Sequence, residues 1–328
     1  MEKVALYPLA LLGVGSLYAI TRFARAMRCK CDLATAYAKM PPSSYKGKVV
    51  WITGASSGLG AEFAKQLGAL GAKLILSART TSALEALRDE IVAAGAAKAD
   101  IAILPLDVSE LKALPAAAEK ACAFFGGVDV LINNAGLSQR EISASTDFDV
   151  TEHMTTVDYL SCACLAKSLL EPMEARGGGR FINISSVAGK VGVPLRTSYC
   201  GAKFALIGYF DALRAEEYAR GSGIAVTNAC PGSVRTNVAR NAVLGKKGVL
   251  RGESDPNIEN GLDPVWVCER ILAAAASDVD EVWIAGPREL FITYASQYLP
   301  AWAKGKLKQN AASMMKATLV SMDEKKGQ

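Results

Sequence analysis

The sequence predicts a doubly wound α/β fold, in which helices cover both faces of a seven-stranded parallel sheet. Short apolar runs recur along the chain, longer helical patterns separate them, and a glycine-rich turn follows the first run. Strands buried on both faces are apolar throughout, and alternation with helices is typical of parallel sheets. The expected strands are KVVWIT (48–53), KLILSA (73–78), IAILPLD (101–107), VDVLINN (128–134), RFINIS (180–185), IAVTNA (224–229) and EVWIA (281–285).

The seven runs indicate one catalytic domain, although 328 residues would accommodate two. We expect that domain over residues 48–287. The flanking regions are expected to be an anchor with a basic flank (1–30), a linker (31–47) and an amphipathic, basic tail (288–328).

Two segments interrupt the alternation of strands and helices. Thr236–Asn260 is polar and glycine-rich, and it is long enough to be a functional loop. In the tail, Tyr294, Tyr298 and Trp302 precede several lysines. This composition suits a membrane interface and equally suits a helix packed on the domain.

The N-terminal run Val4–Ile20 contains no charged residue and is long enough to cross a bilayer core. A cleaved signal peptide is the competing interpretation. A basic cluster stands where its cleavage site would be expected, formed by Arg22, Arg25, Arg28 and Lys30. Because these cations outnumber Lys3 before the run, we expect a single-pass anchor helix with the catalytic domain facing the cytosol.

Composition excludes several classes of function. The net charge of +5 is concentrated at the two ends, so no nucleic-acid partner is expected. Eight cysteines form no CxxC pair, which argues against a structural metal. Cys29 and Cys31 lie beside the expected anchor and are either palmitoylation sites or free thiols. His153 is the single histidine, so a histidine general base is not expected.

The first strand runs into TGASSGLG, Thr53 to Gly60, and then into a helix. Gly54, Gly58 and Gly60 allow a tight turn whose backbone can approach a pyrophosphate at the helix N-terminus, as in Rossmann-like folds. The same letters fit the G-x-S-x-G nucleophile elbow around Ser56. A hydrolase would also need a suitably placed histidine, and only His153 is present, so we favour a dinucleotide site.

Arg79 indicates which dinucleotide binds. It follows the second strand in Ser77-Ala78-Arg79, where an NAD-binding domain would carry Asp or Glu for the adenosine ribose. A guanidinium can instead pair with a 2′-phosphate through charge-assisted hydrogen bonds. The sequence therefore predicts NADP(H), unless Arg79 merely faces solvent.

In TSYCGAK, Tyr199 and Lys203 are four residues apart and share one face of a helix. A free phenol, with a pKa of about 10, is a poor proton donor or acceptor at neutral pH. A nearby ammonium stabilises the ionised phenol. We therefore interpret Tyr199 as the acid/base residue and Lys203 as the residue that tunes it.

These motifs together resemble the short-chain dehydrogenase/reductase family. TGASSGLG, Asp107-Val108, NNAG (133–136), Ser186, the YCGAK box and PGSVRT (231–236) occur in that family's order and span nearly the whole compact region. LSQR after NNAG, SYCGAKFAL and TYASQYLPAW are most similar to the membrane-bound dehydrogenase/reductase member 7 type, near the 11β-hydroxysteroid dehydrogenases.

The resemblance implies further roles. Ser186 would hydrogen-bond the substrate oxygen, with Ser185 as the alternative disfavoured by spacing. Lys203 would also bind the nicotinamide ribose, and Asp107 would lie near the adenine unless it only caps the following helix. The remaining implied cofactor-binding residues are Ser56, Ser57, Leu59, Val108, Asn134, Ala135, Gly136, Pro231, Gly232, Val234 and Thr236, together with Tyr199 and the glycines and arginine named above.

Asp158 departs from the family's pattern, which usually has an asparagine there whose main chain holds a water linked to the lysine. A backbone role survives the exchange. A buried aspartate, however, must be protonated or must meet a donor or a cation. Near Lys203 it would partly offset the pull of that cation on Tyr199; otherwise it is catalytically silent.

The expected function is that of an NADPH-dependent oxidoreductase that interconverts a lipophilic ketone or aldehyde, such as a steroid, retinoid or lipid carbonyl, and its alcohol. The alternative is a cofactor-binding protein of the same fold with little activity. The resemblance also implies membrane lipid as a partner, location in the endoplasmic reticulum and a homodimer.

Overall fold

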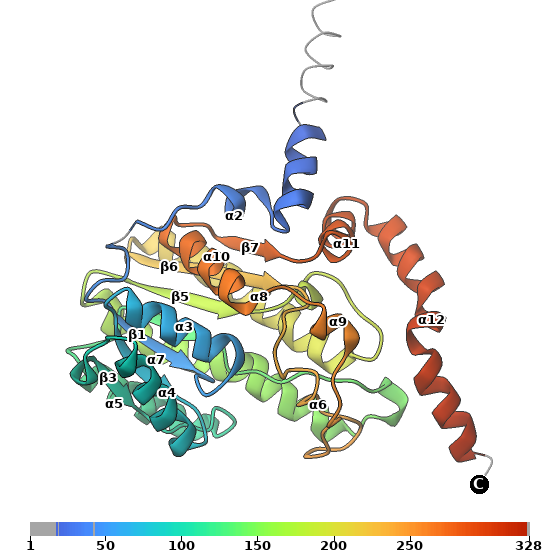
Figure 1. Ribbon diagram of the computed structural model, residues 1–328, viewed down its shortest axis with the longest axis horizontal. Coiled ribbons are helices and arrows are strands. Elements are labelled where there is room, and N and C mark those ends of the chain that lie inside the picture. The colour runs from blue at the N-terminus through green and yellow to red at the C-terminus, as the bar shows by residue number, and fades with distance from the viewer. Residues whose placement is uncertain (1–17, 19, 42, 327–328) are drawn as a thin grey trace, which may run out of the picture.

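The computed structural model describes residues 18, 20–41 and 43–326. Its central feature is one parallel sheet with the strand order β3-β2-β1-β4-β5-β6-β7 (Figure 1). The strands are β1 (Val49–Thr53), β2 (Lys73–Ser77), β3 (Ile101–Ile103), β4 (Val130–Asn133), β5 (Gly179–Ile184), β6 (Ile224–Pro231) and β7 (Glu281–Ile284). All seven expected strands are present, so the predicted doubly wound sheet is confirmed.

Helices connect the strands and cover both faces of the sheet. The α-helices are α2 (Leu33–Tyr37), α3 (Gly58–Ala69), α4 (Thr81–Ala93), α5 (Leu114–Ala123), α6 (Phe148–Thr155), α7 (Ser161–Glu174), α8 (Thr197–Arg220), α9 (Pro256–Glu259), α10 (Pro264–Ala276), α11 (Pro287–Tyr298) and α12 (Pro300–Lys326). The shorter turns are η1 (Lys98–Asp100), η2 (Leu111–Ala113), η3 (Ser143–Ser145), η4 (Thr156–Leu160) and η5 (Val187–Gly189). Of these, η4 is a π-helical turn.

The core consists of two apolar layers, one on each face of the sheet. Val50 and Ile52 of β1 face a layer built with α3, α4 and α10, whereas Trp51 faces a layer built with α5, α7 and α8. All five residues of β1 are buried. Burial on both sides explains why the strands read as continuous apolar runs.

The strand order reverses between β1 and β4, because β2 and β3 continue on one side of β1 while β4 to β7 continue on the other. Open parallel sheets bind ligands outside the carboxyl ends of their strands at such a switch point. The fold therefore places the turn after β1 beside the loop after β4, where the sequence analysis expects the cofactor.

The expected linker, residues 31–47, is packed against the domain. Cys31 forms an isolated antiparallel bridge with Ile284 of β7, and the Asp32 carboxylate caps α2 by accepting the Thr35 N–H at 3.0 Å. The Tyr45 hydroxyl donates to the Leu272 carbonyl of α10 at 2.8 Å. Cys31 and Tyr45 are both buried. This segment is thus part of the core rather than a free connection.

The expected anchor, Val4–Ile20, lies almost wholly outside the described residues. Within the part of the chain that is described, no helix is both long and apolar enough to cross a membrane. Residues 20–29 are helical, and the Phe23 ring meets the Tyr294 ring of α11 edge-on at 5.6 Å.

The tail forms α11 and α12. Leu290, Thr293 and Ala295 of α11 are buried, so this helix packs on the domain. The longer α12 runs along the side of the domain, and its Trp302 is partly exposed. The structure therefore supports packing on the domain for α11, while contact of the tail with a membrane stays a prediction.

Candidate active site

The turn between β1 and α3 forms a cradle at the switch point, held by close backbone approaches. Gly54 has φ +64°, and a Cβ there would lie 2.8 Å from the Ala135 Cα. A Cβ on Gly60 would lie 2.2 Å from the Gly54 carbonyl oxygen. Ser57 precedes α3 without capping it by its side chain, so that helix N-terminus can receive an anion.

Asn134 ties the end of β4 to the cradle. Its side-chain amide donates to the Thr53 and Gly54 carbonyls at 3.0 and 3.1 Å, and its N–H donates to the Thr53 hydroxyl at 3.1 Å. The Ala135 N–H reaches the same hydroxyl at 3.2 Å. These bonds hold the ends of β1 and β4 together. Asn134 also lines the cavity.

The end of the cavity where the sequence predicts the adenosine, called the adenosine end below, contains Arg79 and Asp107, which follow β2 and β3. Arg79 is exposed and lines the cavity. The Asp107 carboxylate accepts from the Ser109 N–H at 2.9 Å and from its hydroxyl at 2.8 Å. Burial favours the neutral acid, but these bonds and the charge of Arg79 outweigh it and lower the pKa of Asp107. Asp107 thus holds a local turn and also faces the cavity.

The catalytic end brings together Tyr199 and Lys203 of α8 with Ser186, which follows β5. The Lys203 ammonium is buried and donates to the Ile184 carbonyl at 3.0 Å. It lies 5.7 Å from the centre of the Tyr199 ring. All three residues line the same cavity, as the sequence analysis expects.

The two candidate serines make different bonds. The Ser185 hydroxyl donates to the Lys203 carbonyl of α8 at 3.3 Å and so supports the helix. The Ser186 oxygen accepts the Ala188 N–H at 3.1 Å, and its own hydrogen has only a long bond of 3.3 Å to the Pro231 carbonyl. The two donated bonds are equally long, so they do not separate the two serines, and the spacing to Tyr199 remains the ground for favouring Ser186.

Asp158 lies behind Lys203, in the π-helical turn η4. Its Oδ1 accepts the Leu137 N–H at 2.9 Å and is 3.4 Å from the Lys203 ammonium. Its Oδ2 is buried and has no hydrogen-bond partner among the described residues. A buried aspartate was expected to be protonated or to meet a donor or a cation, and Asp158 has both a donor and a cation within reach.

The electrostatics of this pair are set by burial and mutual attraction. Burial raises the pKa of Asp158, although the Lys203 ammonium and the Leu137 N–H act in the opposite direction. For Lys203, burial disfavours the ammonium, but the attraction of Asp158 and then Tyr199 outweighs it and raises the pKa. The attraction of its neighbours therefore favours the ammonium form of Lys203.

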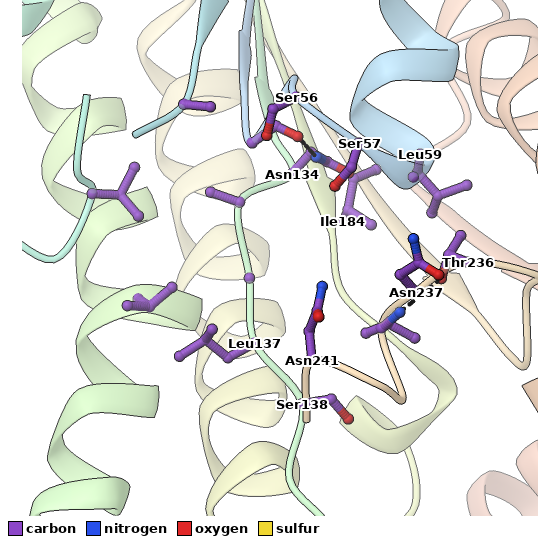
Figure 2. A pocket seen from close by; sticks show the side chains of 18 of the residues that line it. Ser56, Ser57, Leu59, Asn134, Leu137, Ser138, Ile184, Thr236, Asn237 and Asn241 are labelled. Atoms are coloured by element: carbon purple, nitrogen blue, oxygen red, sulfur yellow. Dashed lines mark hydrogen bonds between the residues drawn. The ribbon is translucent and has the colours of Figure 1, made fainter. Parts of the chain in front are cut away.

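The residues above surround one cavity of about 680 Å³. Figure 2 shows Ser56 and Ser57 at one end, Ser138 and Asn241 at the other, and Thr236 and Asn237 along one side. Of the expected site residues, all line the cavity except Gly60 and Asp158, which lie behind it and support Gly54 and Lys203.

A second group of lining residues was not expected from the sequence; it comes from the loop after β4, from α6, from η4 and from the segment 236–260. They are Leu137, Ser138, His153, Val157, Asn237, Val238, Asn241, Val243, Gly248, Leu250 and Ile258. The segment 236–260, which we expect to be a functional loop, forms a wall of the cavity. Its individual members carry no motif, and only their place in a long loop beside the PGSVRT box could have indicated them.

The segment 236–260 is anchored to the loop after β4 by backbone pairing. The Val243 N–H donates to the Ser138 carbonyl at 2.7 Å, and the Arg140 N–H donates to the Val243 carbonyl at 3.1 Å. The Asp255 carboxylate pairs with Arg140 at 3.4 Å and with Arg251 at 3.5 Å. These contacts hold the segment over the cavity.

A doubly wound sheet with a glycine cradle and a tyrosine–lysine pair at its switch point defines a class of nucleotide-dependent oxidoreductases. The short chain dehydrogenase profile matches residues 48–247. The chain therefore belongs to the short-chain dehydrogenase/reductase family, and it is of the dehydrogenase/reductase member 7 type.

Two relatives illustrate the similarity in sequence. Human dehydrogenase/reductase SDR family member 7 is 37% identical over 295 residues, which cover 87% of this chain and 85% of that protein. Dehydrogenase/reductase SDR family member 7B of Bos taurus is 35% identical over 303 residues, covering 92% and 88%.

Solved structures show the same fold with either nicotinamide cofactor. A short-chain dehydrogenase/reductase from Burkholderia phymatum in complex with NAD has a TM-score of 0.69 at 25% identity, covering 77% of this chain and 94% of that one. A metagenomic short-chain oxidoreductase in complex with NADP has a TM-score of 0.58 at 29% identity, covering 73% and 94%. A nicotinamide cofactor is thus supported for this family member.

Proposed function

We propose that this chain is an NADPH-dependent reductase of lipophilic ketones or aldehydes, working through Ser186, Tyr199 and Lys203. The observation that carries the proposal is that these three residues line one cavity with the glycine cradle. A dinucleotide whose pyrophosphate lies on the cradle could extend its nicotinamide to the phenol within that cavity.

The choice of NADP(H) rests on Arg79. The two solved relatives bind different cofactors, so similarity alone leaves the choice open. Arg79 lines the adenosine end, and Ala78 and Thr80 flank it with no carboxylate. A 2′-phosphate would gain a cationic partner there, and neither residue beside Arg79 in the sequence adds a negative charge.

In reduction, the bound cofactor supplies a hydride to the carbonyl carbon. Tyr199 donates its phenolic proton to the carbonyl oxygen, and Ser186 donates a hydrogen bond to that oxygen as negative charge develops on it. The Lys203 ammonium, held by the Ile184 carbonyl and by Asp158, stabilises the phenolate that remains. A proton from solvent then restores the phenol.

The lipophilic substrate class is supported by the wall opposite the cradle. Leu137, Val157, Val243, Leu250 and Ile258 present apolar side chains to the cavity. Small-molecule sites are lined mainly by apolar groups, with a few polar groups that fix orientation. Ser186 and Tyr199 supply polar groups at the reacting end, and Ser138, Asn237 and Asn241 add others along the wall. The apolar side chains among them support a largely hydrophobic substrate that makes a few polar contacts.

Turnover tests the proposal against its alternative, a cofactor-binding protein with little activity. Purified membranes containing the full chain would be assayed for NADPH oxidation with steroid, retinal and aliphatic carbonyls. We expect turnover with at least one class. Tight NADPH binding without turnover of any carbonyl would favour the alternative.

We also propose a single-pass protein of the endoplasmic reticulum membrane, in contact with lipid, with the catalytic domain in the cytosol and a homodimer as its assembly. The support is the uncharged run Val4–Ile20 followed by four cations. A glycosylation acceptor engineered near Gln328 would report the side of the membrane. Efficient glycan addition there would mean a lumenal domain.

A further inference from the structure

Gln139 is a buried polar residue beside the catalytic end that the proposed mechanism does not use. It belongs to the loop after β4 and is fully buried, with 0% exposure. Its Oε1 accepts the Ser198 N–H at 2.9 Å and lies 3.5 Å from the Tyr199 nitrogen. Its Nε2 donates to the Thr146 hydroxyl at 3.2 Å. The Gln139 carboxamide thus lies beside the backbone of Tyr199, the proposed acid/base residue.

The first turn of α8 lacks a cap of its own. The N–H groups in the first turn of a helix have no partner within the helix, and a side chain at the N-cap usually accepts one of them. Here the N-cap residue is Arg196, whose side chain makes no capping bond and is cationic at the positive end of the helix. Gln139 supplies the missing acceptor from another segment of the chain.

The acceptor acts at the place where Tyr199 is positioned. Tyr199 is the third residue of α8, so the orientation of its phenol depends on how firmly the first turn is held. Tyr199 also packs against the buried cluster of Val150, Met154 and Val243, and Ser198 bonds to Thr151 of α6 through their hydroxyls at 2.8 Å. These contacts hold side chains, whereas Gln139 holds the main chain.

The same segment is also bound to the wall of the cavity. Backbone bonds on either side of Gln139 pair it with Val243, as described above. Residues 138–140 therefore bond to the loop that covers the substrate through their main chain and to the catalytic helix through a side chain. A displacement of the loop would be transmitted to the first turn of α8.

We propose that Gln139 is a positioning residue for Tyr199, which caps the catalytic helix from outside and couples its first turn to the substrate-covering loop. The inference rests on the proposed function of Tyr199. The competing explanation is a buried carboxamide whose loss lowers stability and nothing else.

The test compares two substitutions in the full chain. Gln139→Met fills a similar volume but removes the acceptor, and we expect kcat to fall about tenfold to a hundredfold with the KM for NADPH changed less than about threefold. Gln139→Glu is isosteric and keeps the acceptor, so kcat should stay within about threefold of wild type. Its added negative charge disfavours ionisation of the nearby phenol, so the pH–rate profile should move to higher pH.

A matched control separates positioning from stability. Asn228 is also fully buried, and its side chain donates to Asp211 at 2.9 Å, away from the cavity. Asn228→Leu should lower the Tm at least as much as Gln139→Met while kcat stays near wild type. Equal kcat losses in the two variants would overturn the proposal, as would a Gln139→Met enzyme with normal kcat and pH profile.

Amide hydrogen exchange keeps the inference separable from the proposed function. In Gln139→Met, the peptide covering Thr197–Lys203 should exchange faster than in wild type, whereas in Gln139→Glu it should stay protected. A wild-type protein without turnover would refute the proposed function, and unchanged exchange in Gln139→Met would refute the capping role. If Gln139→Met fails to fold, Gln139→Asn, whose shorter side chain withdraws the acceptor, carries the same comparison.

Discussion

The cofactor end and the catalytic end of the cavity are held in shape by different kinds of contact. At the cofactor end, backbone meets backbone: the space beside Gly54 and Gly60 has no room for a Cβ. At the catalytic end, buried polar side chains fix the geometry. Lys203, Asp158 and Gln139 each form a hydrogen bond with a main-chain group of another segment. The first end is fixed by shape and the second by hydrogen bonds and charge.

Substitutions at the two ends should therefore impair different steps of the reaction. Loss of shape in the cradle should weaken cofactor binding, since the pyrophosphate can no longer approach the backbone. Loss of a polar group at the catalytic end should leave cofactor binding largely intact and slow the chemical step. Substitutions at the two ends should therefore separate KM for NADPH from kcat.

The largest expected effect is at the catalytic end. Tyr199→Phe removes the proton donor but keeps the aromatic ring, so kcat at saturating NADPH should fall about a hundredfold or more. Binding of NADPH, followed by quenching of protein fluorescence, should change little. Tyr218→Phe, at an exposed position of the same helix, serves as the control. Retention of more than about a tenth of the rate would remove Tyr199 from the acid/base role.

The cradle is tested by Gly60→Ala. The new methyl group would collide with the Gly54 carbonyl oxygen and with the Asn134 side-chain amide, which would lie 2.5 Å from it. We expect the Kd for NADPH, measured by calorimetry, to rise about tenfold, with a lower Tm. Gly305→Ala in α12, where a Cβ meets nothing within 4 Å, should be neutral or slightly stabilising. An unchanged Kd would mean that the cradle tolerates side chains and that shape does not define it.

Arg79→Ala should affect the cofactor end selectively. Removal of the cation should raise the KM for NADPH about tenfold while that for NADH stays nearly constant, because only NADPH carries the 2′-phosphate. Arg88→Ala in the following helix provides a charge-matched control. Equal changes for both cofactors would rule out the phosphate role.

The sequence predicted the cofactor end well because its requirements are local. Gly54 and Gly60 occur a few residues apart in one turn, and the apolar runs mark the strands that place it. The structure differs from the sequence-based expectation where the surrounding structure determines the local conformation. The third strand, expected over 101–107, ends at Ile103 just before Leu104-Pro105, and proline has no N–H for a ladder bond. In the expected linker, Asp32 before LATAY is a capping signal for α2 that could have been recognised.

The catalytic end was predicted only in part. Tyr199 and Lys203 could be found because they share a helical face, and Ser186 because of the family's spacing. Gln139 could not be found, since its bonding partner Ser198 is 59 residues further along the chain. The π-helical turn around Asp158 also left no sequence signal, because its residues read as ordinary helix. Side-chain bonds between distant segments are set by the fold as a whole.

Asp158→Asn is expected to have the smallest effect, and it probes the charge balance of the catalytic end. The aspartate raises the pKa of Lys203, so its removal should lower that pKa. Lys203 keeps its hydrogen bond to the Ile184 carbonyl and the attraction of Tyr199, which still oppose the effect of burial, so we expect it to remain an ammonium at neutral pH. The asparagine carbonyl can still accept the Leu137 N–H, so the fold and most of the activity should be retained.

The effect of Asp158→Asn on the charge balance is measured by its pH–rate profile. In the native protein, the Asp158 carboxylate lies 3.4 Å from the Lys203 ammonium and cancels part of its field at the Tyr199 phenol. Without that carboxylate the phenol should ionise more readily, and the midpoint of the pH–rate profile should fall by on the order of one pH unit. An unchanged midpoint would mean that burial keeps Asp158 neutral, since a protonated carboxyl exerts no such field. Complete loss of activity would instead show that the carboxylate itself takes part in proton transfer, because an asparagine reproduces its shape and its hydrogen bond but cannot hold a proton.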